Sequence, residues 1–271
     1  MKRAAFLLIL AALQARAATV ATVGDSLADA IYLGLKLQPD LLRKNGIELT
    51  RWSRPSIGLT RVDYFDYTAW LRDTAGLGSV DFCVVQMGAN DLQSIAIEDK
   101  NPESKSQEGK GQETKNQETK NQETKKWTRV GTEDWQRAYT DRVQAFVRTL
   151  KPLRCANVVW LLQPPYQKNK FLSQYHGMIN AVQLAGSATG AAVYEIDAGA
   201  DDYGPDGIHF NKDFCFKLAR AVVNLFASSR PPSAGTNCAS CHASPSLPPV
   251  SRADLAPLIP RAGQPAAVQT R

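Results

Sequence analysis

After its first seventeen residues, the sequence lacks any apolar run long enough to cross a membrane. It also lacks a basic stripe interleaved with aromatic residues, which would indicate a nucleic-acid surface. The formal net charge of +6 falls by three, to +3, once Lys2, Arg3 and Arg16 leave with a signal peptide. A balance this weak does not favour a polyanionic partner. We therefore expect neither nucleic-acid binding nor a stable membrane span in the mature chain.

The N-terminal segment has the organisation of a secretory signal peptide. Lys2 and Arg3 give a positive start, residues 4–13 are apolar, and Ala15-Arg16-Ala17 is a small-residue cleavage site. An uncleaved anchor is the alternative, because the first expected strand begins almost directly after Ala17. We expect residues 1–17 to be the signal and the mature chain to be periplasmic or secreted, in a bacterial envelope.

Along residues 18–228, segments of strand length alternate with segments of helical period. The expected strands are 18–23, 47–52, 80–87, 157–162 and 192–196, and the expected helices follow residue 26 and cover 132–150, 171–188 and 213–226. The nearly all-apolar segment 80–87 is typical of a central parallel strand covered on both faces. The alternation predicts an α/β fold: a mostly parallel five-stranded sheet with helices on both faces, in three layers. Its reactive loops should lie beyond the carboxyl ends of the strands.

A serine lies between the first expected strand and the first expected helix, in Gly24-Asp25-Ser26. Free amide N–H groups and the positive end of the helix dipole would lie beside the Ser26 hydroxyl and stabilise a developing anion there. Taken alone, the tripeptide favours a structural helix cap, since Ser and Asp before a helix are common in that role. An α/β-hydrolase elbow is excluded, because the sequence contains no G-x-S-x-G pentapeptide.

Two later motifs offer the other parts of a nucleophilic site. Asp206 and His209 lie three residues apart, so one short loop can supply a general base and the acceptor that fixes its tautomer. Asn90 follows the 80–87 strand in a tight turn, where its amide could donate to an oxyanion without adding charge. Taken singly, a surface Asp with a capping His, or an ordinary turn Asn, would explain each motif.

In this order, Gly24-Asp25-Ser26, Gly88-Ala89-Asn90-Asp91 and Asp206-Gly207-Ile208-His209 resemble the motifs of the SGNH (GDSL-type) hydrolase superfamily. The resemblance covers roughly residues 18–228. Gly58 corresponds to the family's glycine, although Ser53 stands where the family usually has Asn. Residues 56–61 and 131–135 further resemble a poorly characterised branch of exported bacterial SGNH proteins.

The resemblance implies a flavodoxin-like fold and a serine esterase. Ser26 would be the nucleophile, His209 the base and Asp206 the residue that orients it, while the Ser26 and Gly58 N–H groups and the Asn90 side chain would form the oxyanion hole. Hydrolysis would need no metal or cofactor, and we expect a monomer acting on a small-molecule or glycan ester, for example in deacetylating envelope glycans. The same machinery could serve an acyltransferase, and a non-catalytic envelope binding protein is the alternative from another class.

A repetitive segment interrupts this plan at residues 98–126. Lysine recurs every five residues from Lys100 to Lys125, and a five-residue period fits neither helix nor strand. We predict a disordered insertion on the active-site side of the sheet. Trp127 and Trp135 follow it and are candidates for lining the cleft, with core packing the default for Trp135.

Residues 229–271 are rich in Pro, Ala and Ser, and we predict a disordered tail. Within it, Cys238, Cys241 and His242 have the spacing of a c-type haem attachment site. The 29 residues after His242 contain no methionine or histidine for the opposite axial position. A local disulfide, or the remnant of a lost cytochrome segment, therefore remains an alternative to covalent haem.

The other three cysteines belong to the expected hydrolase domain. Cys83 lies in a buried strand and is expected to be inert, whereas Cys155 and Cys215 could pair.

Overall fold

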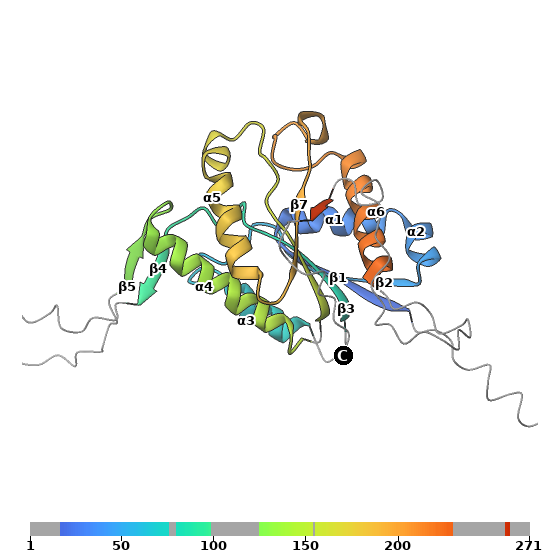
Figure 1. Cartoon of the computed structure of the whole chain (residues 1–271), viewed down its shortest axis with the longest axis horizontal. Coiled ribbons are helices and arrows are strands. Elements are labelled where there is room, and N and C mark those ends of the chain that lie inside the picture. The colour runs from blue at the N-terminus through green and yellow to red at the C-terminus, as the bar shows by residue number, and fades with distance from the viewer. Residues whose placement is uncertain (1–16, 76–79, 99–124, 154, 230–257, 261–271) are drawn as a thin grey trace, which may run out of the picture.

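The structure is a computed structural model that describes residues 17–75, 80–98, 125–153, 155–229 and 258–260 (Figure 1). Residues 1–16 of the expected signal peptide, residues 99–124 of the repeat and the Cys238-Cys241-His242 motif lie outside the described residues.

A sheet of parallel strands forms the centre of the domain, as the alternation predicts. Its strand order is β2-β1-β3-β6-β7-β8. The five parallel strands are β1 (Ala18–Gly24), β2 (Ile47–Ser53), β3 (Val80–Gln86), β6 (Cys155–Leu161) and β7 (Ala192–Ile196). The short β8 (Leu258–Pro260) adds an antiparallel edge beside β7.

Helices cover both faces of the sheet. They are α1 (Ser26–Lys36), α2 (Pro39–Lys44), α3 (Tyr67–Thr74), α4 (Glu133–Leu150), α5 (Lys170–Ser187) and α6 (Lys212–Ser229). Helices α1 and α6 pack together on one side of the sheet and α4 packs on α5 on the other (Figure 1). The predicted three-layer α/β fold is confirmed.

The central strands are buried because both of their faces meet helices. In β3 the side chains from Phe82 to Gln86 are all buried, which explains its nearly continuous apolar sequence. The register pairs Gly24 at the end of β1 with Gln86 at the end of β3 and with Ser53 at the end of β2. The loops that follow these three strands therefore begin side by side, at one edge of the sheet.

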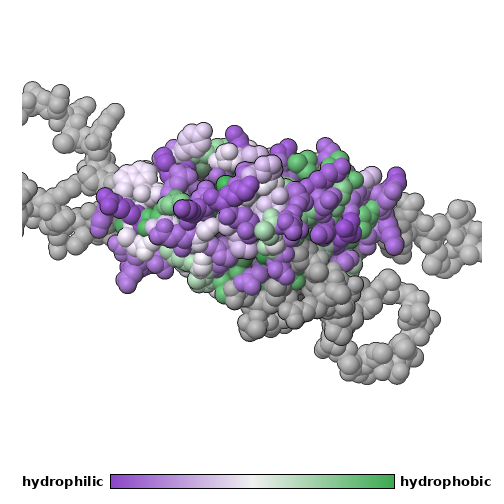
Figure 2. All heavy atoms as spheres, turned by 90° about the horizontal axis from the view of Figure 1, so that it is seen from above, coloured by the Kyte–Doolittle hydropathy of each residue, from purple (hydrophilic) through white to green (hydrophobic). Residues whose placement is uncertain are grey.

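The outer surface mixes polar and apolar residues. In Figure 2, hydrophobic residues are scattered among hydrophilic ones on the face that is visible. Scattered exposed apolar side chains are normal on a folded domain. Within the described ranges, no helix combines the length and the apolarity that a bilayer span requires.

Both ends of the predicted insertion are structured. Strands β4 (Ile95–Glu98) and β5 (Lys125–Thr128) pair antiparallel, so residues 98, 125 and 126 belong to a short hairpin base and not to a disordered segment. Trp127 lies on β5 and is 49% exposed, whereas Trp135 is fully buried in α4. Core packing therefore accounts for Trp135.

The predicted tail also contains an ordered piece. Leu258–Pro260 form β8, and the Leu258 side chain is buried. The edge of β7 offers unpaired backbone groups to which a distant segment can bind. Three residues are too few for a strand pattern to be recognised in a sequence.

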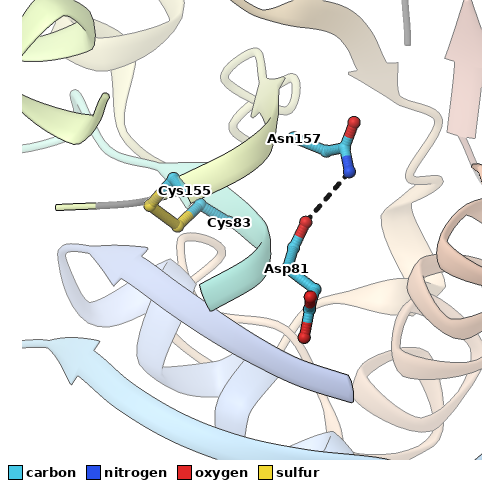
Figure 3. Close-up of a disulfide and its surroundings, with 4 residues drawn as sticks. All are labelled: Asp81, Cys83, Cys155 and Asn157. Atoms are coloured by element: carbon cyan, nitrogen blue, oxygen red, sulfur yellow. Dashed lines mark hydrogen bonds between the residues drawn. A yellow bond between two sulfur atoms is a disulfide. The ribbon is translucent and has the colours of Figure 1, made fainter. Parts of the chain in front are cut away.

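A disulfide joins two neighbouring strands in the centre of the sheet. Cys83 of β3 is bonded to Cys155 of β6 (Figure 3). Cys83 is therefore not an inert thiol, and Cys155 does not pair with Cys215. The thiol of Cys215 is free, and burial raises its pKa to about 11. The sequence could not identify this pair, because it does not reveal that β3 and β6 are neighbours.

Candidate active site

The turn between β1 and α1 presents Ser26 at the first position of the helix. Gly24 has a φ of +133°, and a Cβ there would lie 1.9 Å from the carbonyl oxygen of Gln86, so the sharp turn requires glycine. Asp25 caps the helix by accepting a hydrogen bond from the Leu27 N–H at 2.9 Å. The Ser26 side chain is thereby freed from capping, and its N–H is among those without an acceptor inside the helix.

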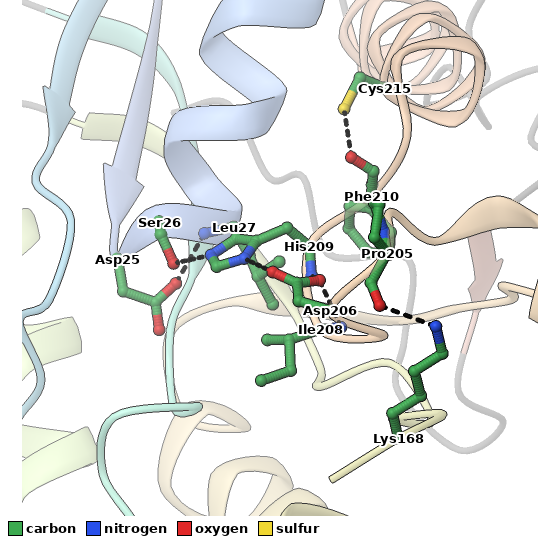
Figure 4. Close-up of polar contacts among 10 residues, drawn as sticks. All are labelled: Asp25, Ser26, Leu27, Lys168, Pro205, Asp206, Ile208, His209, Phe210 and Cys215. Atoms are coloured by element: carbon green, nitrogen blue, oxygen red, sulfur yellow. Dashed lines mark hydrogen bonds and ion pairs between the residues drawn. The ribbon is translucent and has the colours of Figure 1, made fainter.

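His209 reaches Ser26 from a loop 183 residues further along the chain (Figure 4). Its Nε2 lies 2.9 Å from the Ser26 Oγ, and its Nδ1 lies 2.6 Å from Oδ2 of Asp206. The structure therefore brings the three predicted residues together in one continuous hydrogen-bonded series. This arrangement suits a base that is oriented from behind and faces a hydroxyl.

The loop that carries Asp206 and His209 is closed by its own backbone. Tyr203 and Phe210 form an isolated antiparallel bridge, and the Gly204 N–H donates to the His209 carbonyl at 2.7 Å. The Lys168 ammonium donates to the carbonyl of Pro205 at 2.7 Å (Figure 4). These bonds fix the loop on both sides, which limits the positions open to the imidazole.

Asp206 is held as a carboxylate. Partial burial alone would raise its pKa, but hydrogen bonds from the His209 ring and from the N–H groups of Ile208 and His209 outweigh this and lower the pKa to about 2. Both N–H groups lie 2.9 Å from Oδ1. Asp206 therefore stays charged at neutral pH and can stabilise an imidazolium.

Asn90 lies in the turn after β3, and its amide is directed towards the loop that follows β2. Its Nδ2 donates to the carbonyl of Ile57 at 3.1 Å, the residue before Gly58. Ser56 in the same loop has a φ of +62°, a conformation that non-glycine residues adopt rarely and mostly at constrained sites. The structure thus brings the Asn90 turn and the Gly58 loop into contact.

Asp91 is a buried residue of the site that the sequence interpretation passed over. It accepts hydrogen bonds from the N–H groups of Leu59 and Thr60 and, at 2.7 Å, from the hydroxyl of Tyr139. Burial raises its pKa, against the effect of these donors. In the sequence, only its position directly after Asn90 pointed to a role for Asp91. Its hydrogen-bond donors come from two distant segments, so its burial could not be predicted.

Asp25 makes a second link between the loops. Its other carboxylate oxygen, Oδ2, accepts from the Gly88 N–H at 3.0 Å, so one side chain ties the Ser26 turn to the Asn90 turn. Complete burial raises the pKa of Asp25 to about 7, although backbone donors oppose the shift. The capping bond of Asp25 is local, whereas its bond to Gly88 joins residues 63 positions apart in the chain and could not be predicted from the sequence.

A cavity of about 190 Å³ adjoins the Gly58 and Asn90 side of the site. Other residues that line it are Ile57, Arg61, Tyr64 and Phe65. Trp127 reaches this region through Arg61, whose guanidinium lies 5.6 Å from the centre of the indole ring. Among the described residues no cluster of three or more His, Cys, Asp or Glu side chains could hold a metal ion.

Two solved structures have similar chain traces. A candidate SGNH hydrolase from Slackia heliotrinireducens is 16% identical with a TM-score of 0.47, and the alignment covers 78% of this chain and 97% of that one. The psychrotrophic esterase EstA from Pseudoalteromonas sp., in a structure inhibited by monoethylphosphonate, is also 16% identical, with a TM-score of 0.41 and coverage of 74% and 92%. No curated protein sequence matches the chain.

A family model matches most of the α/β domain. It is described as protein of unknown function (DUF459) and covers residues 19–207, which include Ser26, Gly58, Asn90 and Asp206. His209 lies two residues beyond the matched range. The chain belongs to the DUF459 family.

Proposed function

We propose that this protein is an exported serine hydrolase that cleaves carboxylic esters. The observation that carries the proposal is the series Asp206–His209–Ser26, with distances of 2.6 and 2.9 Å between successive side chains. A hydroxyl facing an imidazole that is itself oriented by a carboxylate is the arrangement that activates serine.

Acylation begins at Ser26. Its Oγ attacks the carbonyl carbon of the ester while its proton passes to Nε2 of His209. The tetrahedral intermediate then collapses, the bond between the carbonyl carbon and the alcohol oxygen breaks, and the imidazolium returns the proton to the leaving alcohol. The Asp206 carboxylate holds the ring and stabilises its charge during both steps.

Deacylation follows the same steps with water as the nucleophile. His209 removes a proton from a water molecule, the resulting oxygen attacks the acyl-enzyme, and Ser26 leaves with the proton from the imidazolium. A second alcohol in place of water would give acyl transfer, because the first half-reaction is shared. We assign hydrolysis as the primary activity, with small-molecule or glycan esters as substrates.

The anionic oxygen of each intermediate needs donors that are already in place. The N–H groups of Ser26 and Gly58 and the Asn90 amide supply them in this proposal. The contact of Asn90 with Ile57 supports the grouping, since it holds the amide beside the Gly58 loop. Removing one such donor typically lowers kcat by about 10²- to 10³-fold.

Export is supported by the cysteine chemistry. The disulfide between Cys83 and Cys155 belongs to an oxidising compartment, such as the bacterial periplasm or the extracellular space. This agrees with the signal-peptide pattern at residues 1–17.

The test is covalent labelling of the exported protein with a fluorophosphonate, read by intact mass. We expect one phosphonyl adduct on the wild type and on Ser228→Ala, a control near the end of α6, and none on Ser26→Ala. Asn90→Ala should keep its fold and lose about 10²-fold or more in turnover of a short ester. A folded wild-type protein that takes no adduct would overturn the proposal, and an Asn90→Ala variant with unchanged turnover would remove Asn90 from the oxyanion hole.

A further inference from the structure

The cavity beside Gly58 and Asn90 has no part in the relay from Asp206 to Ser26. We propose that it is the acyl-binding subsite and that Arg61 makes it selective for short acyl groups ending in a carboxylate. This inference rests on the serine hydrolase function proposed above and names the substrate class of that site.

The position of the cavity decides which half of the ester it receives. The leaving alcohol must lie beside His209, because that residue returns a proton to it. The cavity is lined on the other side, by Gly58 and Asn90, and neither Ser26 nor His209 is among the described residues that line it. A carbonyl oxygen held by Gly58 and Asn90 would direct the acyl chain into this space.

The guanidinium of Arg61 is fixed at the wall of the cavity. Asp63 receives two hydrogen bonds from it, at 2.9 Å from Nε and 2.8 Å from Nη2. On another side it lies over the Trp127 ring, 5.6 Å from the centroid. The pair with Asp63 leaves the Nη1 donors of Arg61 available, and a side chain already held in place loses little entropy when it binds a ligand.

Further positive charge lies around the cavity. The guanidinium of Arg54 lies 4.3 Å from the centre of the Phe65 ring, and Phe65 lines the cavity. No carboxylate among the described residues forms an ion pair with Arg54. Behind the wall, Arg142 donates to the carbonyls of Leu59 and Thr60.

Acidic side chains lie near two of these three cations. Asp63 pairs with Arg61, and Arg142 interacts with the buried Asp91 and also with Asp63 and Asp66. Arg54, beside the Phe65 ring, has no such ion pair among the described residues. A carboxylate at the end of the acyl group would pair with Arg61 and Arg54 through charge-assisted hydrogen bonds.

The size and the polarity of the cavity also favour a short acyl group with a polar end. A cavity of about 190 Å³ suits a short acyl group. Thr60, Gln93 and Arg61 give it polar walls, and a long alkyl chain would desolvate these groups without replacing their hydrogen bonds.

The test compares two esters that share ethanol as the leaving group, ethyl butyrate and monoethyl succinate. The succinyl group has a carboxylate where the butyryl group has a methyl. We expect wild type to favour monoethyl succinate by about tenfold or more in kcat/KM, as charge-assisted hydrogen bonds exceed neutral contacts. Arg61→Gln should bring the ratio close to one, chiefly by lowering kcat/KM for monoethyl succinate, and Arg61→Lys should retain part of the preference.

Arg51→Gln is the matched control. Arg51 also makes a double hydrogen bond, to Asp29, and lies over an aromatic ring, that of Tyr32. Its removal should leave the ratio at the wild-type value. Equal rates for the two esters, a preference for ethyl butyrate, or a preference that survives Arg61→Gln in a folded variant would overturn the assignment of the subsite while leaving the hydrolase intact. Hydrolysis of neither ester, together with an absence of fluorophosphonate labelling, would overturn the hydrolase and the subsite with it.

Discussion

The carboxylate of Asp91 fills the space that a side chain on Gly58 would need. A Cβ added to Gly58 would lie 2.1 Å from Oδ1 of Asp91. The same oxygen accepts the N–H groups of Leu59 and Thr60, the two residues that follow. Residue 91 therefore positions the loop that carries the proposed Gly58 donor, and it follows directly after the proposed donor Asn90.

Gly58→Ala should damage the site through this contact. The added methyl forces Asp91 and the loop apart, which displaces the residue 58 N–H from the oxyanion. We expect kcat for a short ester to fall by about 10- to 100-fold, with a lower Tm. Gly177→Ala is the control, since a Cβ there meets nothing within 4 Å in α5 and should stabilise the helix by about 0.5–1 kcal/mol. A Gly58→Ala enzyme with wild-type kcat would show that the residue 58 N–H has no part in catalysis.

Asp91→Asn tests the positioning role without changing side-chain size. The amide cannot accept from all the donors that surround Asp91, and its own N–H₂ would face the N–H groups of Leu59 and Thr60. We expect kcat to fall by about tenfold or more while KM changes little, because the loss concerns the transition state. Circular dichroism and Tm verify that the variant is folded. A lower Tm with an unchanged kcat would show that Asp91 stabilises the fold and does not position the oxyanion hole.

The sequence was sufficient to predict the parallel sheet and the elements that carry Ser26, Asn90 and His209. Strand β3 shows why: its apolar run is long and unbroken, and the polar motif begins directly after it. Local patterns of this kind need no knowledge of distant contacts.

The features that could not be predicted depend on contacts between distant segments. The Cys83–Cys155 bond requires the strand order, and the burial of Asp91 requires donors from the Gly58 loop and from Tyr139. Strand β8 is three residues long and is ordered by the edge of β7. The cavity and its Arg61 wall likewise arise where the loop after β2 meets Trp127 of β5.

Asp25 should make the stability of the domain depend on pH. Burial raises its pKa from 3.8 to about 7, so between these values the folded protein holds a proton that the unfolded chain releases. The free energy of unfolding should therefore fall as the pH rises through this window, by up to about 1.4 kcal/mol per pH unit. Asp206, with its pKa lowered to about 2, acts in the opposite direction but only below about pH 4.

Asp25→Asn removes this titration, so urea unfolding of the variant should show a smaller decline between pH 4.5 and pH 7 than wild type. Asp40 is exposed, and the free energy of unfolding of the control variant Asp40→Asn should decline with pH as that of wild type does. An unchanged pH dependence in Asp25→Asn would show that Asp25 is already ionised at pH 4.5 in the folded protein.

The Cys83–Cys155 bond should contribute to stability because it links β3 and β6 across 72 residues of chain. Such a link reduces the conformational freedom of the unfolded chain, and its loss typically costs about 2–5 kcal/mol. We expect the double variant Cys83→Ala/Cys155→Ala to lose stability in this range, by urea unfolding of the exported protein under oxidising conditions. Cys215→Ala, which removes the free thiol on α6, should lose less stability.

Dithiothreitol should lower the stability of wild type towards that of the double variant and leave the stability of the double variant unchanged. If wild type is equally stable with and without the reductant, and its intact mass after alkylation shows free thiols at both positions, the bond does not form in the exported protein and its support for an oxidising compartment is withdrawn.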